Sequence, residues 1–142
     1  MGAARVNLRL LAKGIAGRLR TDALIVDEFL PHVDALASLS RDEIILLASL
    51  HRCFAVPDKS AHYKWEAVEN ELARCGWDKA RILATAGRAL RSGYVFPEAH
   101  GLGQMVVSIT FLYKPSPLFL DLCQTIDFDD ALQCEKHVAS AS

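Results

Sequence analysis

The stretch from Glu71 to Leu112 constrains the fold of this chain more than any other part of the sequence. It starts with a short helical pattern and a Cys75-Gly76 turn, and a longer helical pattern follows. After a break at Pro97 it ends in residues typical of strands. This order predicts two helices that cross closely at a tight turn and are followed by a β-hairpin.

The longer helical pattern of this stretch covers about residues 79–92. Asp78 precedes it and is placed to cap its first turn through the side-chain carboxylate. Gly93 is placed to end it in a left-handed conformation, and Pro97 prevents it from resuming. The apolar residues that recur at helical spacing, and that we expect to form the buried face, are Ile82, Leu83, Ala86, Leu90 and Tyr94.

The opposite face of this helix is basic. We expect Arg81, Thr85 and Arg88 to point outward, with Lys79 and Arg91 beside them. In a DNA major groove, Arg can donate two hydrogen bonds to guanine, and Thr can contact a base edge or a thymine methyl group. Lys79 and Arg91 would lie near phosphates, which position a protein without specifying sequence. The alternative interpretation is an ordinary solvated basic surface.

The residues after Pro97 predict a hairpin. We expect a polar loop from Glu98 to Gln104 and a strand from Met105 to Tyr113, with which Val95-Phe96 can pair. No Arg or Lys occurs between Glu98 and Tyr113. A hairpin this apolar fits contact with another protein as well as contact with DNA.

Helical patterns also precede this stretch. Residues 5–20 carry an apolar stripe and a basic stripe, and residues 1–21 contain no acid. This segment is interpreted as a packing or dimerisation helix, a phosphate-binding arm, a membrane-surface helix or a cleaved transit peptide. A second helix starts at Thr21 or Asp22, and Pro31 is expected to interrupt it or to open the next one. The residues expected to point inward beyond Pro31 are Val33, Leu36 and Leu39.

Two serines mark further helix starts. Ser40 to Glu43 forms a capping-box pattern, and the apolar helix that it opens, to about Phe54, is predicted to be the central core helix. Ser116 lies in a stiff turn from Lys114 to Pro117 and is predicted to cap a final helix. The residues of that helix expected to point inward are Leu118, Phe119, Leu122 and Ile126.

Composition narrows the function classes. The 142 residues are expected to form one domain, and a hydrophobic content of 51% suggests an oligomer interface or a partner. No apolar run approaches the roughly 20 residues of a membrane span, so we expect no integral membrane insertion. The absence of a signal-peptide pattern and four widely spaced cysteines indicate a reducing, cytoplasmic location.

Motifs for catalysis are absent from the sequence. It has no phosphate-binding glycine loop and no GxSxG, and His51 and Cys53 do not face each other on a helix. Cys123, Cys134 and His137 are too loosely spaced for a zinc set. We therefore expect no enzymatic activity, no metal and no cofactor.

ELARCGWDKARILATAGRALRSGYV is similar to the two-helix segment of bacterial winged helix-turn-helix regulators, and MVVSITFLYK is similar to the strand after their wing. SLSRDEIILLASLHR and the chain length resemble the MarR-type branch. The resemblance implies a mainly α fold with a small β-hairpin wing. It also implies a dimer paired through terminal helices, with the second helix of the motif in the major groove. We divide the chain into an N-terminal helical segment (1–39), a winged-helix domain (40–114) and a C-terminal helix with an acidic tail (115–142).

Two function hypotheses follow. The first is a homodimeric transcriptional regulator that binds double-stranded DNA through the basic helix. Its expected contact residues are Lys79, Arg81, Thr85, Arg88 and Arg91. The second is a winged-helix protein-interaction module, such as a phage-defence, immunity or assembly subunit, that uses the apolar wing. The basic helix favours the first hypothesis, and the uncharged wing favours the second.

Overall fold

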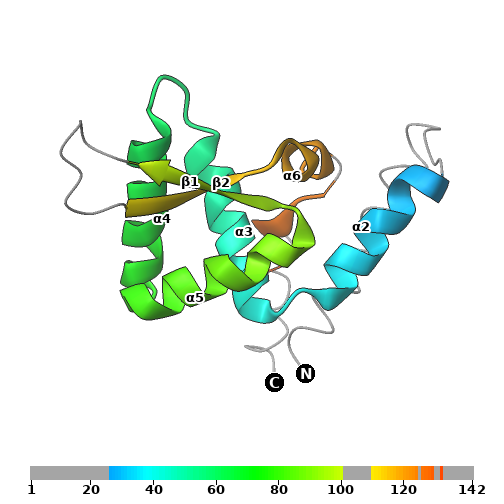
Figure 1. Cartoon of the computed structure of the whole chain (residues 1–142), viewed down its shortest axis with the longest axis horizontal. Helices are drawn as coiled ribbons and strands as arrows, with labels where there is room; N and C mark the ends of the chain where they lie inside the picture. Colours follow the sequence, from blue (N-terminus) through cyan, green and yellow to red (C-terminus); the bar gives the residue numbers. More distant parts are fainter. Residues whose placement is uncertain (1–25, 101–109, 125, 130–131, 133–142) are drawn as a thin grey trace.

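The computed structural model of the chain describes residues 26–100, 110–124, 126–129 and 132. It is mainly helical with one two-stranded antiparallel hairpin, which confirms the expected coarse fold class (Figure 1). The helix expected over residues 5–20 lies outside the described residues. The elements in chain order are α2 (Val26–Ser38), α3 (Arg41–Phe54), α4 (Ala61–Arg74), α5 (Lys79–Ala89), the 3₁₀ helix η1 (Leu90–Ser92), β1 (Val95–His100), β2 (Thr110–Pro115) and α6 (Pro117–Leu122).

Helix α3 is the central core helix, as predicted. Its capping box is formed, because the Glu43 amide donates to Ser40 Oγ and the Ser40 amide donates to the Glu43 carboxylate. Ile44, Leu47 and Leu50 have no exposed surface. α3 packs against α4, α5 and β2, so it fixes the positions of both later helices and of the hairpin (Figure 1).

Helices α4 and α5 are joined by a short turn. Gly76 adopts a positive φ of 90° there, and the Trp77 amide donates to the Leu72 carbonyl at 3.1 Å. Asp78 caps α5 as predicted, accepting from the Arg81 amide at 2.7 Å. Gly93, with φ 76°, ends η1 in the left-handed region, which also confirms the prediction.

The hairpin pairs Val95 with Pro115 and His100 with Thr110. The expectation of a loop from Glu98 was wrong for Glu98 to His100, which extend β1 because β2 supplies their ladder partners. The predicted strand residues from Met105 to Ile109 lie outside the described part of the chain. The ring of Tyr113 in β2 lies 5.3 Å from that of Trp65 in α4, which seats the hairpin on the helices.

Helix α2 runs through Pro31, so the expectation that Pro31 breaks the helix or starts a new one was wrong. A proline removes one backbone donor and disfavours the helix locally. The residues after it are held by packing, since His32, Leu36 and Leu39 are buried. His32 Nδ1 also hydrogen-bonds with Tyr94 Oη at 2.8 Å. Tertiary contacts therefore outweigh the local preference.

Helix α6 begins at its predicted cap, where Ser116 Oγ accepts from the Phe119 amide. Phe119, Leu122 and Ile126 are buried as predicted. Leu118 was expected to point inward, but it is exposed, because this short helix buries the side that carries Phe119 and Leu122. None of the helices that the structure describes is long and apolar enough to cross a membrane.

Candidate nucleic-acid interface

The outer face of α5 combines cationic and small side chains. Its exposed residues are Lys79, Ala80, Arg81, Ala84, Gly87 and Arg88, and α5 contains no acid. A methyl group added at Gly87 would meet no described atom within 4 Å beyond its own helix backbone and chain neighbours, so the face is open at this position. The sequence prediction of a basic outer face is confirmed for Lys79, Arg81 and Arg88.

Arg81 is held by two partners on that face. Its guanidinium donates to both carboxylate oxygens of Asp42 in α3, at 3.2 and 2.9 Å. The same guanidinium lies 4.2 Å above the centre of the Trp77 ring. The hydrogen bond to Asp42 raises the pKa of Arg81 above its ordinary value. Arg81 is thus oriented by an anion before any ligand is present.

Arg91 has a different environment from the one expected. Its guanidinium donates to both oxygens of Glu43, at 2.5 and 3.0 Å, and to the carbonyls of Ser38 and Arg88 at 2.9 Å. Glu43 is buried, so Arg91 neutralises a carboxylate inside the fold. We therefore assign Arg91 a structural role in place of the expected phosphate contact.

Thr85 does not point outward, so its predicted position was wrong. It is fully buried, and its Oγ1 accepts from the Arg88 guanidinium at 3.2 Å. The buried stripe of α5 consists of Ile82, Thr85, Ala86 and Ala89. These positions have the i, i+3, i+4, i+7 spacing of a core face, and this signal was present in the sequence.

The two arginines together clamp α5 to α3. Arg81 from the first turn of α5 and Arg91 from η1 bind Asp42 and Glu43, which are adjacent in the first turn of α3. The sequence pattern from Ser40 to Glu43 predicts a helix cap, but nothing local in it indicates that Asp42 and Glu43 pair with the basic helix. The two ion pairs tie α5 and η1 to the first turn of α3.

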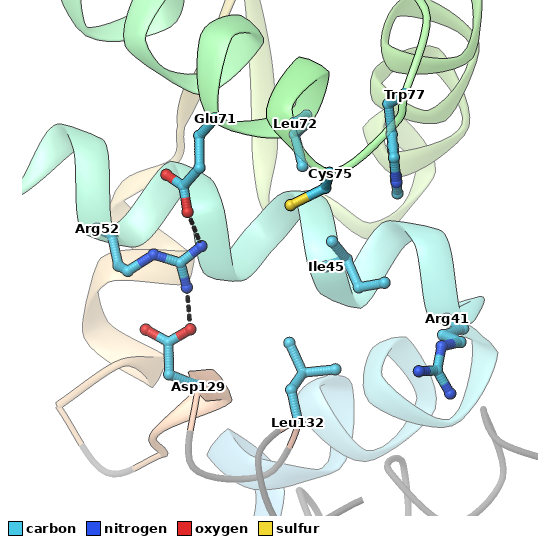
Figure 2. Close-up of a pocket in the computed structure, with 9 residues that line it drawn as sticks. All are labelled: Arg41, Ile45, Arg52, Glu71, Leu72, Cys75, Trp77, Asp129 and Leu132. Atoms are coloured by element: carbon cyan, nitrogen blue, oxygen red, sulfur yellow. Dashed lines mark hydrogen bonds and ion pairs between the residues drawn. The ribbon is translucent and has the colours of Figure 1, made fainter. Parts of the chain in front are cut away.

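A cavity of about 510 Å³ lies between α3, the end of α4 with the turn that follows it, and the residues Asp129 and Leu132 (Figure 2). It is lined by Arg41, Ile45, Arg52, Glu71, Leu72, Cys75, Trp77, Asp129 and Leu132. Figure 2 shows the Arg52 guanidinium between the carboxylates of Glu71 and Asp129, and it pairs with both. The Arg52 guanidinium thus ties Asp129 to α3 and α4.

The charges at this cavity wall are tuned by burial and by hydrogen bonds. Burial alone would raise the pKa of Glu71, but hydrogen bonds from Arg52, Cys53 and Ser49 bring the pKa below its ordinary value. The Cys53 thiol and the Ser49 hydroxyl each donate to Glu71 Oε2 at 3.2 Å. Burial and the neighbouring Glu71 raise the pKa of Cys53 to about 11.

We expect the cysteines to differ strongly in alkylation. Cys75 is exposed, whereas burial raises the pKa of Cys53 to about 11 and that of Cys123 to about 12. At pH 8 only about a thousandth of Cys53 would be thiolate, which is the reactive form. Iodoacetamide labelling of the native protein, followed by peptide mapping, should modify Cys75 before Cys53 and Cys123. Fast labelling of Cys53 or Cys123 at this pH would contradict the described environments, and urea-unfolded protein provides the fully reactive control.

The hairpin presents a different surface from α5. Phe96 and Phe111 are 45% and 53% exposed, and Lys114 is paired with Glu98 at 3.4 Å. Leu118 and Leu120 of α6 are also exposed. Among the described hairpin residues, the exposed surface is therefore aromatic, and the charge of Lys114 is neutralised by Glu98.

No family model, curated protein or solved structure matches this chain. Cys134 and His137, the loosely spaced zinc candidates, lie outside the described residues.

Proposed function

We propose that this protein binds duplex nucleic acid, with α3, α4, α5 and the hairpin acting as a winged helix-turn-helix. In this proposal α5 is the recognition helix. The supporting observation is the outer face of α5, which is cationic, contains no acid and is open at Gly87. A chain with a net charge of −1 thus carries a local basic surface on this helix.

The shape of this face suits a groove. Ala80, Ala84 and Gly87 keep the centre of α5 low, so the helix could approach the floor of a major groove closely. Lys79, Arg81 and Arg88 are long enough to reach phosphates or base edges from its margins. The proposed contact residues are therefore these three cations, without Thr85 and Arg91.

Charge placed at Ala84 tests the proposal directly. Ala84 is exposed in the middle of the face, so Ala84→Glu and Ala84→Lys should both fold with little loss of stability. Ala84→Glu should weaken binding to a labelled random duplex by roughly 30-fold or more at about 50 mM salt, because it sets an anion against the phosphates. Ala84→Lys should bind much more tightly than Ala84→Glu, because it places a cation of similar length at the same site. Fluorescence anisotropy measures both.

The two Ala84 variants also show which results would contradict the proposed nucleic-acid binding. Both variants carry long side chains of similar helix propensity at one site, so a shared loss would indicate a steric effect. Absence of duplex binding by the wild type at about 50 mM salt, where electrostatic binding is strong, would contradict the proposal.

The exposed aromatic residues of the hairpin favour a second function, a protein-interaction module. Phe96 and Phe111 expose large apolar area, and aromatic residues are enriched at protein interfaces. This alternative becomes the preferred one if the wild type and Ala84→Lys both fail to bind duplexes.

A further inference from the structure

We propose that Asp42 acts as an internal competitor for phosphate, holding Arg81 until a phosphodiester takes its place. This inference rests on the proposed nucleic-acid function of α5. It concerns how the same face is regulated, and it assigns a role to an acidic residue of α3.

The geometry of the Arg81–Asp42 pair resembles that of an arginine–phosphate contact. Two nitrogens of the guanidinium donate to two oxygens of one anion. Carboxylates and phosphates both accept such paired donors from Arg. Asp42 therefore occupies the donors that Arg81 would otherwise offer to a phosphodiester.

The pair is accessible enough to exchange. The side chains of Arg81 and Asp42 are 46% and 27% exposed, so an approaching anion can reach the guanidinium from solvent. The second pair of the clamp serves as an internal contrast. Glu43 is only 1% exposed, and separating it from Arg91 would leave a buried charge without its partner. Of the two arginines, Arg81 is the one that can leave its anion.

Trp77 limits how far Arg81 must move. The indole is buried in the turn before α5 and the guanidinium lies over its ring, an arrangement that stabilises Arg through cation–π attraction. The contact with the ring does not use the N–H donors that bind Asp42, so a phosphate can replace Asp42 while Arg81 stays over Trp77. Little side-chain ordering is then needed when a phosphate binds.

Two consequences follow for binding. Formation of the Arg81–phosphate contact requires loss of an existing ion pair, which lowers affinity. The freed Asp42 carboxylate then remains near the phosphates and repels them. Both effects disappear when Asp42 loses its charge.

The test compares Asp42→Asn with Asp78→Asn in duplex titrations at low salt. Asp78 also acts on Arg81 through its charge, but it accepts from the Arg81 backbone amide and makes no described side-chain pair with Arg81. Asparagine caps helices about as well as aspartate, so Asp78→Asn should keep α5 intact. We expect about fivefold tighter binding for Asp42→Asn, near the upper range for an exposed ion pair, and less than about twofold for Asp78→Asn.

Asp42→Asn in an Arg81→Ala background shows how much of its effect depends on the exchange of Asp42 for phosphate on Arg81. Arg81→Ala alone should weaken binding and reduce the slope of log K against log salt by about one. In that background Asp42→Asn should tighten binding less than it does in the wild-type background, because repulsion by the carboxylate is still removed but no guanidinium remains to be released. Thermal unfolding of each variant verifies that the compared proteins are folded.

The outcomes separate this inference from the proposed function. If the wild type binds duplexes but Asp42→Asn binds equally or more weakly, the competitor role is overturned and the proposed function stands. The role is also overturned if Asp42→Asn and Asp78→Asn tighten binding equally, since this would show a general charge effect. If neither the wild type nor Ala84→Lys binds, the proposed function fails and the inference fails with it.

Discussion

Phe119→Ala should destabilise the fold by about 3–5 kcal/mol, the range typical of a fully buried aromatic residue. Phe119 has no exposed surface, and its ring packs against Tyr94 and Phe128 at centroid distances of 5.7 and 5.3 Å. It also meets the edge of His51 in α3. The Phe119 side chain of the six-residue helix α6 thus contacts three separate parts of the chain. These are His51 in α3, Tyr94 at the start of the hairpin, and Phe128 in the segment after α6. The loss in the free energy of unfolding can be measured by urea unfolding monitored by circular dichroism.

The neighbouring residue provides the control. Leu118 lies in the same helix turn and is 45% exposed, so Leu118→Ala should change stability by less than about 1 kcal/mol. Equal losses for the two variants would mean that α6 buries a different side from the one that carries Phe119. A loss near zero for Phe119→Ala would exclude a role for α6 in the core.

Local signals predicted the starts of three helices and the end of the α5–η1 helical run. Ser40, Asp78 and Ser116 all cap helices where the sequence placed them, and Gly93 ends the helical run in the left-handed region. A cap involves residues within three positions of one another, so its pattern is readable in a single sequence. The coarse fold was predictable from the same signals together with apolar periodicity.

Long-range ion pairs could not be read in this way. The pairing of Arg81 with Asp42 and of Arg91 with Glu43 depends on how α5 crosses α3. In the sequence, arginines that form such pairs have the same spacing as arginines on a solvent-exposed helix face. Two of the predicted contact cations were therefore assigned to the outer face although they bind acids of the same chain. Thr85 is a different case, because the spacing of Ile82, Thr85, Ala86 and Ala89 already marked it as a core position.

Arg91→Ala should lower the free energy of unfolding by about 3 kcal/mol, as expected when a buried charge loses its partner. Glu43 would keep its hydrogen bond from the Ser40 amide but lose both guanidinium bonds, and the Ser38 carbonyl would lose a donor. Arg88 is the matched control, since its described side-chain bond goes to Thr85 at 3.2 Å. Arg88→Ala should change stability by less than about 1 kcal/mol.

The comparison of Arg91 and Arg88 also separates folding from binding. If our assignment is correct, Arg88→Ala weakens duplex binding in a protein of nearly normal stability. Arg91→Ala should be less stable than the wild type. Its duplex affinity, measured well below its unfolding temperature, should stay within about threefold of the wild type, because the exposed cations of α5 remain. The reverse pattern, a stable Arg91→Ala with weak binding, would return Arg91 to the proposed phosphate contacts and contradict the assigned structural role of the Arg91–Glu43 pair.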